Sequence, residues 1–299
     1  MAFMNFEDDT ASLPRDSGRA NLHSGWSIEV MPRTAAKISD FKPILPEKTR
    51  IYIAHIGGTP IDDMVETARR LRQDGFAVMP HLPARAIADR TMLELWLNRY
   101  RSEADVTEAL LLGGGDSRPA GDFDSSIQMI ETGFFDRFGF KRLHVAGHPE
   151  GSRDIDKDGS TRNVDQSLLW KTGFASRTDA AMAIVTQFAF DAQPVIDWSE
   201  RIRDLGVTLP IHVGLAGPAK LKTLLQYAVT CGVGPSLKVL QKRALDVTRL
   251  LSPYEPTEVA DHLMAYKNSH PDSLISQFHL FPLGGIVAAV EWARRQAAI

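Results

Sequence analysis

Apolar residues recur along this chain in short continuous runs, and each run gives way to polar residues or glycine. The longest run begins at Ala181 and ends at Asp191, with Thr186 and Gln187 ahead of its last aromatic residues. A run that is apolar without alternation predicts a strand buried on both faces, as in a parallel sheet. Its polar end predicts the point where the strand leaves the core, and the Gln187 amide could pair there with a heterocyclic ligand.

Eight such runs alternate with segments of helical periodicity. The predicted strands cover residues 26–32, 50–56, 76–82, 108–112, 142–150, 181–191, 209–215 and 275–281. The predicted helices cover 59–75 (capped by Thr59, with Pro60 at its first position), 93–100, 195–205, 218–230 and 237–251, and two more follow Pro256 and pass through Trp292. Residues 151–177 are predicted to form a long polar excursion between the fifth and sixth strands.

This alternation predicts an α/β fold, a single (β/α)8 TIM barrel with extra helices between strands seven and eight. A doubly wound sheet is the alternative, disfavoured because no Gly-x-Gly-x-x-Gly follows the first strand. Residues 1–24 are polar and lack periodicity, which predicts a flexible N-terminal leader ahead of a catalytic barrel at 25–299.

Composition narrows the class of partner. The 299 residues are 43% hydrophobic with a formal net charge of −3, so no basic field favours nucleic acid or an anionic membrane. Cys231 is the only cysteine, which excludes an internal disulfide. The sequence has neither a signal peptide nor a membrane-spanning run, so we expect a cytoplasmic protein with a small-molecule substrate. Assembly into a homo-oligomer is left open.

Polar residues at the carboxyl ends of the predicted strands converge if the barrel closes. These residues are Glu29, His55, His81, Asp116, His148, Glu150, Gln187 and His279. Taken singly, a strand-end histidine is more often structural than catalytic. Glu29 lies between apolar residues, where burial disfavours its charged form and favours a general acid near neutral pH.

Other motifs are weaker evidence for function. Gly113–Gly115 before Asp116 permits close backbone approach to a flat or phosphorylated ligand. The turn at 154–159 matches the opening of a calcium loop but lacks its closing Glu, so a solvated acidic turn is the preferred interpretation. A metal site is not expected, because no His-x-His stands on the first strand.

In these residues the chain resembles the methylenetetrahydrofolate reductase family in its short bacterial form, from Trp26 to the end. The matching motifs are Glu29 before Pro32, Pro80-His81-Leu82, Gly115-Asp116, Pro149-Glu150, Thr186-Gln187-Phe188 and Phe190-Asp191. The resemblance implies a barrel oxidoreductase of one-carbon metabolism that serves methionine biosynthesis. It would move hydride from NADH or NADPH, through FAD, to 5,10-methylenetetrahydrofolate, or run in reverse.

The resemblance also implies roles. Glu29 would be the general acid that opens the imidazolidine ring, Asp116 would stabilise the iminium cation, and Gln187 and Phe190 would contact the folate, together with Glu29 and Asp116. The implied cofactor residues are His55, His81, Gly114, Gly115, Asp116, His148, Glu150, Asp165 and Lys171.

The departures from the family concern the flavin. Gly114, Pro83 and His148 stand where the family has Arg, Thr and Tyr. Losing the Arg removes a bidentate phosphate ligand. Two alternatives follow: FAD held through altered contacts, which we expect, or direct hydride transfer from NADH to folate. A pterin-dependent methyltransferase and a folate-binding barrel without redox activity are the alternative functions.

Overall fold

Eight parallel strands close into a barrel in sequence order in the computed structural model, which describes residues 25–230, 240 and 253–297. The strands are β1 (Ser27–Val30), β2 (Arg50–Ile53), β3 (Ala77–Pro83), β4 (Glu108–Leu112), β5 (Arg142–Gly147), β6 (Ala181–Ala189), β7 (Ile211–Ala216) and β8 (Ile275–Phe281). The barrel closes where Ser27 of β1 pairs with His279 of β8. The predicted TIM barrel is confirmed.

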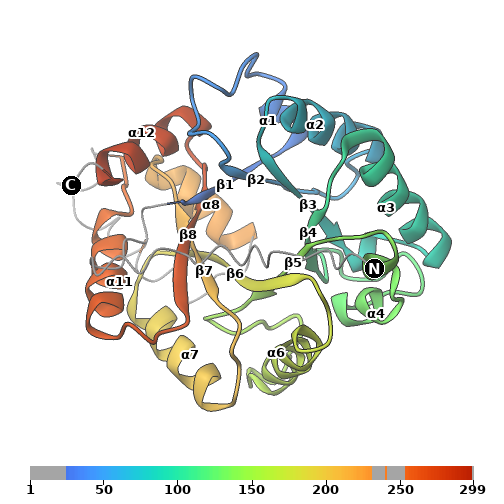
Figure 1. Cartoon of the computed structure of the whole chain (residues 1–299). Coiled ribbons are helices and arrows are strands. Elements are labelled where there is room, and N and C mark those ends of the chain that lie inside the picture. The colour runs from blue at the N-terminus through green and yellow to red at the C-terminus, as the bar shows by residue number, and fades with distance from the viewer. Residues whose placement is uncertain (1–24, 231–239, 241–252, 298–299) are drawn as a thin grey trace, which may run out of the picture.

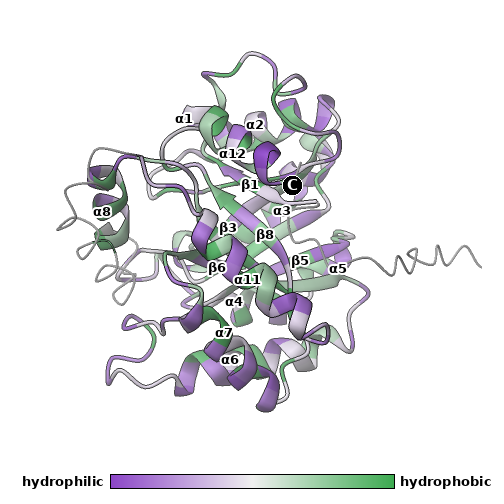
Figure 2. Ribbon diagram, turned by 90° about the vertical axis from the view of Figure 1, so that its left-hand side faces the viewer, coloured by the Kyte–Doolittle hydropathy of each residue, from purple (hydrophilic) through white to green (hydrophobic). Residues whose placement is uncertain are grey.

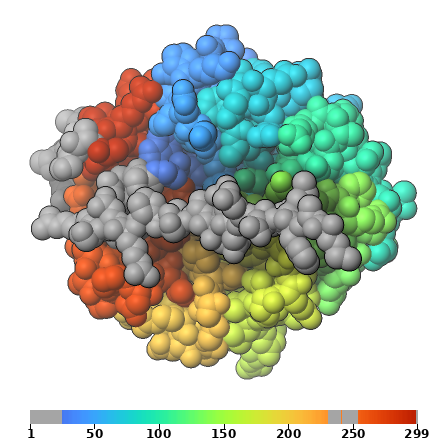
Figure 3. Space-filling model, in the orientation of Figure 1, coloured from blue at the N-terminus to red at the C-terminus, as the bar shows by residue number. Residues whose placement is uncertain are grey.

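Helices form a ring around the strands, and Figure 3 shows the units following one another round it in sequence order. They are α1 (Pro32–Ala35), α2 (Ile61–Gln73), the 3-10 turn η1 (Ala84–Ala86), α3 (Arg90–Ala104), α4 (Ser126–Glu131), α5 (Phe134–Arg137), α6 (Arg162–Ala175), α7 (Gln193–Asp204), α8 (Leu221–Thr230), α11 (Thr257–Ser269) and α12 (Ile286–Ala297). The helices α8 and α11 confirm extra helices between β7 and β8. In Figure 2, α8 stands out on the left, from the end of the barrel that faces away from the viewer in Figure 1.

Several predicted boundaries change. The helix predicted from a Thr59 cap begins at Ile61, with Pro60 as its N-cap. The polar excursion predicted at 151–177 contains α6, and α4 and α5 were not predicted at all. The predicted leader at 1–24 lies outside the described residues, as does nearly all of the helix predicted at 237–251.

Strand side chains alternate between two cores. Ile28, Ile51 and Ile53 belong to the large outer core that packs against the helices. Tyr52 and Met79 belong to a smaller cluster inside the barrel, with Leu110 and Val185. None of the helices that the structure describes is long and apolar enough to cross a bilayer.

Paired charges cover the amino-terminal end of the barrel. At the start of β2, Arg50 donates from Nε and Nη2 to the Glu108 carboxylate at 2.6 and 3.2 Å. Arg142 approaches the same carboxylate from β5, with its Nε 3.5 Å from Oε1. Both arginines are therefore partnered by one acid.

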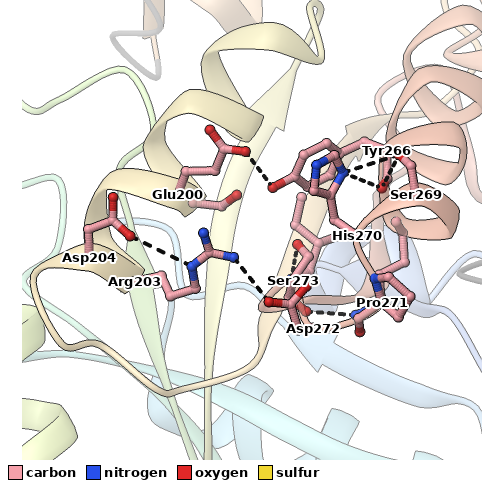
Figure 4. A network of polar contacts seen from close by, with 12 residues as sticks. Glu200, Arg203, Asp204, Tyr266, Ser269, His270, Pro271, Asp272 and Ser273 are labelled. Atoms are coloured by element: carbon pink, nitrogen blue, oxygen red, sulfur yellow. Dashed lines mark hydrogen bonds and ion pairs between the residues drawn. The ribbon is translucent and has the colours of Figure 1, made fainter.

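A second network lies where the chain enters β7 and β8 (Figure 4). Tyr266 of α11 donates its hydroxyl to Glu200 of α7 at 2.9 Å. Arg203 approaches Asp204 and Asp272, at 3.8 and 3.6 Å. These contacts join α7 to α11 and to the turn before β8.

Candidate active site

A cavity of about 2100 Å³ opens at the carboxyl-terminal end of the barrel. Its floor is formed by strand residues and its walls by the loops that follow the strands, together with faces of α6, α8 and α12. The residues predicted for the site that line it are Glu29, His55, His81, Gly114, Gly115, His148, Glu150, Lys171, Gln187 and His279. The strand-end prediction therefore brings ten side chains or glycines to one cavity.

Three strands bring Glu29 and two histidines together in the cavity floor. His81 of β3 places Nε2 3.3 Å from Glu29 Oε2. His279 of β8 places Nε2 3.9 Å from the same oxygen. Glu29 remains 19% exposed at its side chain, so its carboxylate is accessible from the cavity while the histidines hold it from the sides.

The sequence predicts that burial keeps Glu29 protonated near neutral pH, and the contacts of its carboxylate point the other way. Burial acts to raise its pKa, as the sequence suggests, but hydrogen bonding to His279 and His81 outweighs burial and lowers the pKa to about 2. Glu29 is therefore ionised at neutral pH. The sequence could not show this, because the two histidines come from strands distant along the chain.

Ser27 orients His279 from below. Its hydroxyl lies 2.9 Å from His279 Nδ1, and both side chains are fully buried. Burial lowers the pKa of His279, against the opposing effect of Glu29, so the ring is neutral at neutral pH. The ionised Glu29 carboxylate can only accept, so it favours the tautomer with the proton on Nε2, and Nδ1 then accepts from the Ser27 hydroxyl.

The barrel interior beneath contains polar rings that the sequence reasoning missed. Tyr52 and His144 share a hydrogen bond of 2.5 Å between the phenol oxygen and Nδ1. The His212 ring lies 4.8 Å from that of His144, and Tyr52 packs edge-on against His279 at 4.4 Å. Burial lowers the pKa of His144, and it lowers that of His212 to about 3.

A signal for these residues exists in the sequence. His144 lies between Leu143 and Val145, and His212 between Ile211 and Val213, so each alternates with outward apolar residues. Period-two alternation marks inward positions throughout a barrel strand, whereas the prediction considered only the strand ends.

A bulge in β6 positions Gln187. The pairing of β6 with β7 shifts register between Val185 and Phe188. There Thr186 Oγ1 accepts from Gly214 N at 2.9 Å and donates to the Gln187 carbonyl at 2.8 Å. A Cβ on Gly214 would lie 2.5 Å from that carbonyl oxygen, so glycine is required for this approach. The bulge leaves the Gln187 side chain exposed at the cavity wall.

One face of α6 forms a cavity wall. The wall residues are Asn163, Val164, Ser167, Leu168 and Lys171, a spacing that places them along one side of a helix. Lys171 is 5% exposed, and burial lowers its pKa to about 8. Burial, followed by the nearby charge of Lys171, lowers the pKa of His148 to about 4.

Three predicted residues do not line the cavity. Asp116 is exposed on the loop after β4. Phe190 is buried against Tyr254, with ring centroids 5.4 Å apart, whereas Phe188 lines the cavity instead. Asp165 faces α7, where its carboxylate pairs with Arg201 at 2.5 Å.

The acidic turn at 154–159 has a structural role. Asp156 accepts from the backbone N–H groups of Asn163 and Val164 at 3.0 and 3.1 Å, at the start of α6. Asp154 pairs with Arg85 at 2.6 Å. Among the residues that the structure describes, no group of three or more His, Cys, Asp or Glu could hold a metal ion.

The position that would carry the family's flavin arginine cannot hold a long side chain. Gly114 has a φ of +102°, and a Cβ there would lie 3.1 Å from Pro83 Cβ. Gly114 and Pro83, two of the positions where the chain departs from the family, are therefore neighbours in space. The neighbouring Arg85 is already paired, with Asp124 at 2.9 Å as well as Asp154. The Arg85 guanidinium on this wall is therefore already occupied by two carboxylates.

Comparison with known proteins supports the fold. No protein-family profile matches the chain. An uncharacterized protein from Clostridium thermocellum that binds two copies of 5-methyl-5,6,7,8-tetrahydrofolic acid is similar, with a TM-score of 0.59 and 10% identity over 94% of this chain and 97% of that one. Dihydropteroate synthase from Anaplasma phagocytophilum, with bound 6-hydroxymethylpterin-monophosphate, gives a TM-score of 0.45 and 12% identity over 92% and 99%. At 10% identity the likeness to the Clostridium thermocellum protein establishes a shared fold.

Proposed function

We propose that the cavity binds a reduced folate and that the chain is an NAD(P)H-dependent methylenetetrahydrofolate reductase. The observation that carries the proposal is the ionised Glu29 carboxylate beside His81 at the cavity floor, with Gln187 on the wall. A proton-holding pair and an amide are the groups that a pterin substrate requires. The folate ligand of the Clostridium thermocellum barrel supports the same substrate class.

The floor suits the first step, opening of the imidazolidine ring. The methylene carbon to N10 bond breaks, N10 gains a proton, and an iminium cation remains at N5. The Glu29–His81 pair supplies the proton, with the His81 imidazole as the donor and the Glu29 carboxylate 3.3 Å from its Nε2 holding the ring in place. His279 keeps the carboxylate in place.

Glu29 then assists the second step. Hydride that originates in the dihydronicotinamide reaches the methylene carbon, directly or through a flavin, and gives 5-methyltetrahydrofolate with an oxidised nicotinamide. A fixed carboxylate in a partly desolvated pocket stabilises the iminium cation that accepts the hydride. Glu29 takes the role expected of Asp116, whose side chain lies outside the cavity lining.

The test is a reaction of the purified protein with NADH or NADPH and 5,10-methylenetetrahydrofolate. We expect nicotinamide oxidation that depends on the folate, with 5-methyltetrahydrofolate identified by chromatography. If neither NADH nor NADPH is oxidised at any concentration of the folate, the reductase proposal is overturned.

A folate-binding barrel without redox activity is the second candidate. It is favoured by one observation, the two 5-methyltetrahydrofolate molecules bound by the similar Clostridium thermocellum protein. Calorimetric binding of 5-methyltetrahydrofolate without nicotinamide oxidation would select it. Transfer of the methyl group to a corrinoid would instead select the methyltransferase.

A further inference from the structure

Lys171 is a buried cation on the cavity wall, and no acid among the described residues forms an ion pair with it. Its side chain is only 5% exposed and faces the cavity from α6. No ion pair joins it to any residue within the described part of the chain, whereas Arg85 and Asp165 on neighbouring segments are paired. A buried ammonium without a partner is costly to keep charged, so its retention points to an anionic ligand.

The surroundings of Lys171 suit a phosphate group. His148 beside it is neutral at neutral pH and can donate one ring N–H without adding repulsion to the ammonium. Ser167 lies one helical turn before Lys171 on the same face and also lines the cavity. Lys171 therefore supplies an ammonium next to two neutral donors, His148 and Ser167, which together suit a phosphate oxygen.

The wall beside Gly114 disfavours a flavin in this space. The arginine position is closed by Gly114 against Pro83, and Arg85 is paired with Asp124 and Asp154. Lys37 and Arg153 also line the cavity but are exposed, so Lys171 is the buried cation there for a single dinucleotide.

We propose that Lys171 holds the diphosphate of a nicotinamide dinucleotide, and that hydride passes from this dinucleotide directly to the folate without a bound flavin. This inference rests on the proposed reductase function. The balance is complete without another redox group: the dihydronicotinamide loses a hydride and becomes a pyridinium, the methylene carbon gains it, and N10 takes the proton from the Glu29–His81 pair.

Binding measurements test the site without reference to turnover. Titration with NADH, followed by its fluorescence, is expected to give a dissociation constant at least about tenfold higher for Lys171→Met, the loss of one charge-assisted contact. Lys141→Met, at an exposed lysine before β5, is the matched control and should bind NADH like the wild type. Lys171→Arg keeps the charge and should retain most of the affinity. Equal NADH affinity in Lys171→Met would overturn the assignment.

The pH dependence of binding adds an independent readout. The Lys171 ammonium loses its proton above about pH 8 in the free protein, so NADH affinity should fall as pH rises through this range. Lys171→Arg should abolish that fall, because guanidinium stays charged.

An isotope experiment separates this inference from the proposed function. The purified protein reacts with NADH deuterated at both C4 positions and methylenetetrahydrofolate, and its absorbance is recorded beforehand. Direct transfer predicts one deuterium in the product methyl group and no flavin absorbance. A stoichiometric flavin, or NADH consumption with an unlabelled methyl group, would overturn the inference and leave the reductase standing, because a reduced flavin exchanges its N5 hydrogen with water. Absence of folate-dependent NADH consumption would instead overturn the reductase.

Discussion

The two ends of the barrel differ in how their charged side chains are paired. At the amino-terminal end Glu108 accepts from Arg50 and lies near Arg142, so each charge has an opposite partner. At the carboxyl-terminal end Glu29 is held by two histidines and Lys171 has no acid beside it within the described residues. At the amino-terminal end the protein's own side chains pair every one of these charges. At the carboxyl-terminal end the Lys171 ammonium would gain an opposite charge only from a bound ligand.

This difference separates stability from chemistry. In TIM barrels the active site lies at the carboxyl ends of the strands, whereas the opposite face serves stability. Here the division extends through the interior, where neutral His144 and His212 lie between the paired arginines and the cavity floor. Changes at the two ends should therefore have effects of different kinds.

Acid should produce the largest change in stability, acting on the carboxyl-terminal half. His144, His148 and His212 have lowered pKa values in the folded state, so below about pH 6.5 the unfolded chain binds protons that the folded chain does not. Stability therefore falls as pH falls, by about 4 kcal/mol for the three between about pH 7.5 and 5.5.

Urea unfolding at the two pH values measures this loss. His148→Asn removes one of the three histidines and should reduce the pH dependence by about one proton. Stability that stays constant over this range would show that the interior histidines are not kept neutral.

Breaking the paired charges at the amino-terminal end should have the next largest effect. Glu108→Gln leaves Arg50 and Arg142 without their acid and should lower the free energy of unfolding by about 3 kcal/mol. NADH binding and turnover at a temperature where the variant stays folded should match the wild type. Lost activity in a folded Glu108→Gln protein would argue against the division between the ends.

The network of Figure 4 should contribute least. Tyr266→Phe removes the hydroxyl that donates to Glu200 and should cost about 1 kcal/mol in urea unfolding. Asp272→Asn is the comparison, because its side chain is 80% exposed and its pairing with Arg203 should contribute less than about 1 kcal/mol. A larger loss for Asp272→Asn than for Tyr266→Phe would contradict this order.

The sequence predicts the fold better than the site. The bounds of β4 and β8 follow from their apolar runs, and strand order follows from the barrel. The helix α6 was missed because its cavity face carries Asn163, Ser167 and Lys171, so its apolar periodicity is weak. A helix that lines a polar cavity on one side lacks the usual amphipathic pattern.

One aromatic site residue was misplaced because its strand is irregular. The bulge after Val185 changes the phase of β6, so Phe188 lines the cavity and Phe190 packs against Tyr254. The pKa of Glu29 depends on His81 and His279, contacts that exist only after the barrel closes. Tertiary contacts of this kind leave no local trace.

The most direct test of the account is the turnover of Glu29→Gln in the methylenetetrahydrofolate-dependent oxidation of NADH, measured beside Glu108→Gln in the same assay. Glutamine keeps the size of the side chain but cannot hold the proton with His81. We expect kcat to fall at least about 100-fold in Glu29→Gln, with calorimetric folate binding retained and Glu108→Gln as active as the wild type. Unchanged turnover in Glu29→Gln would contradict the assignment of the proton transfer to the carboxyl-terminal end of the barrel.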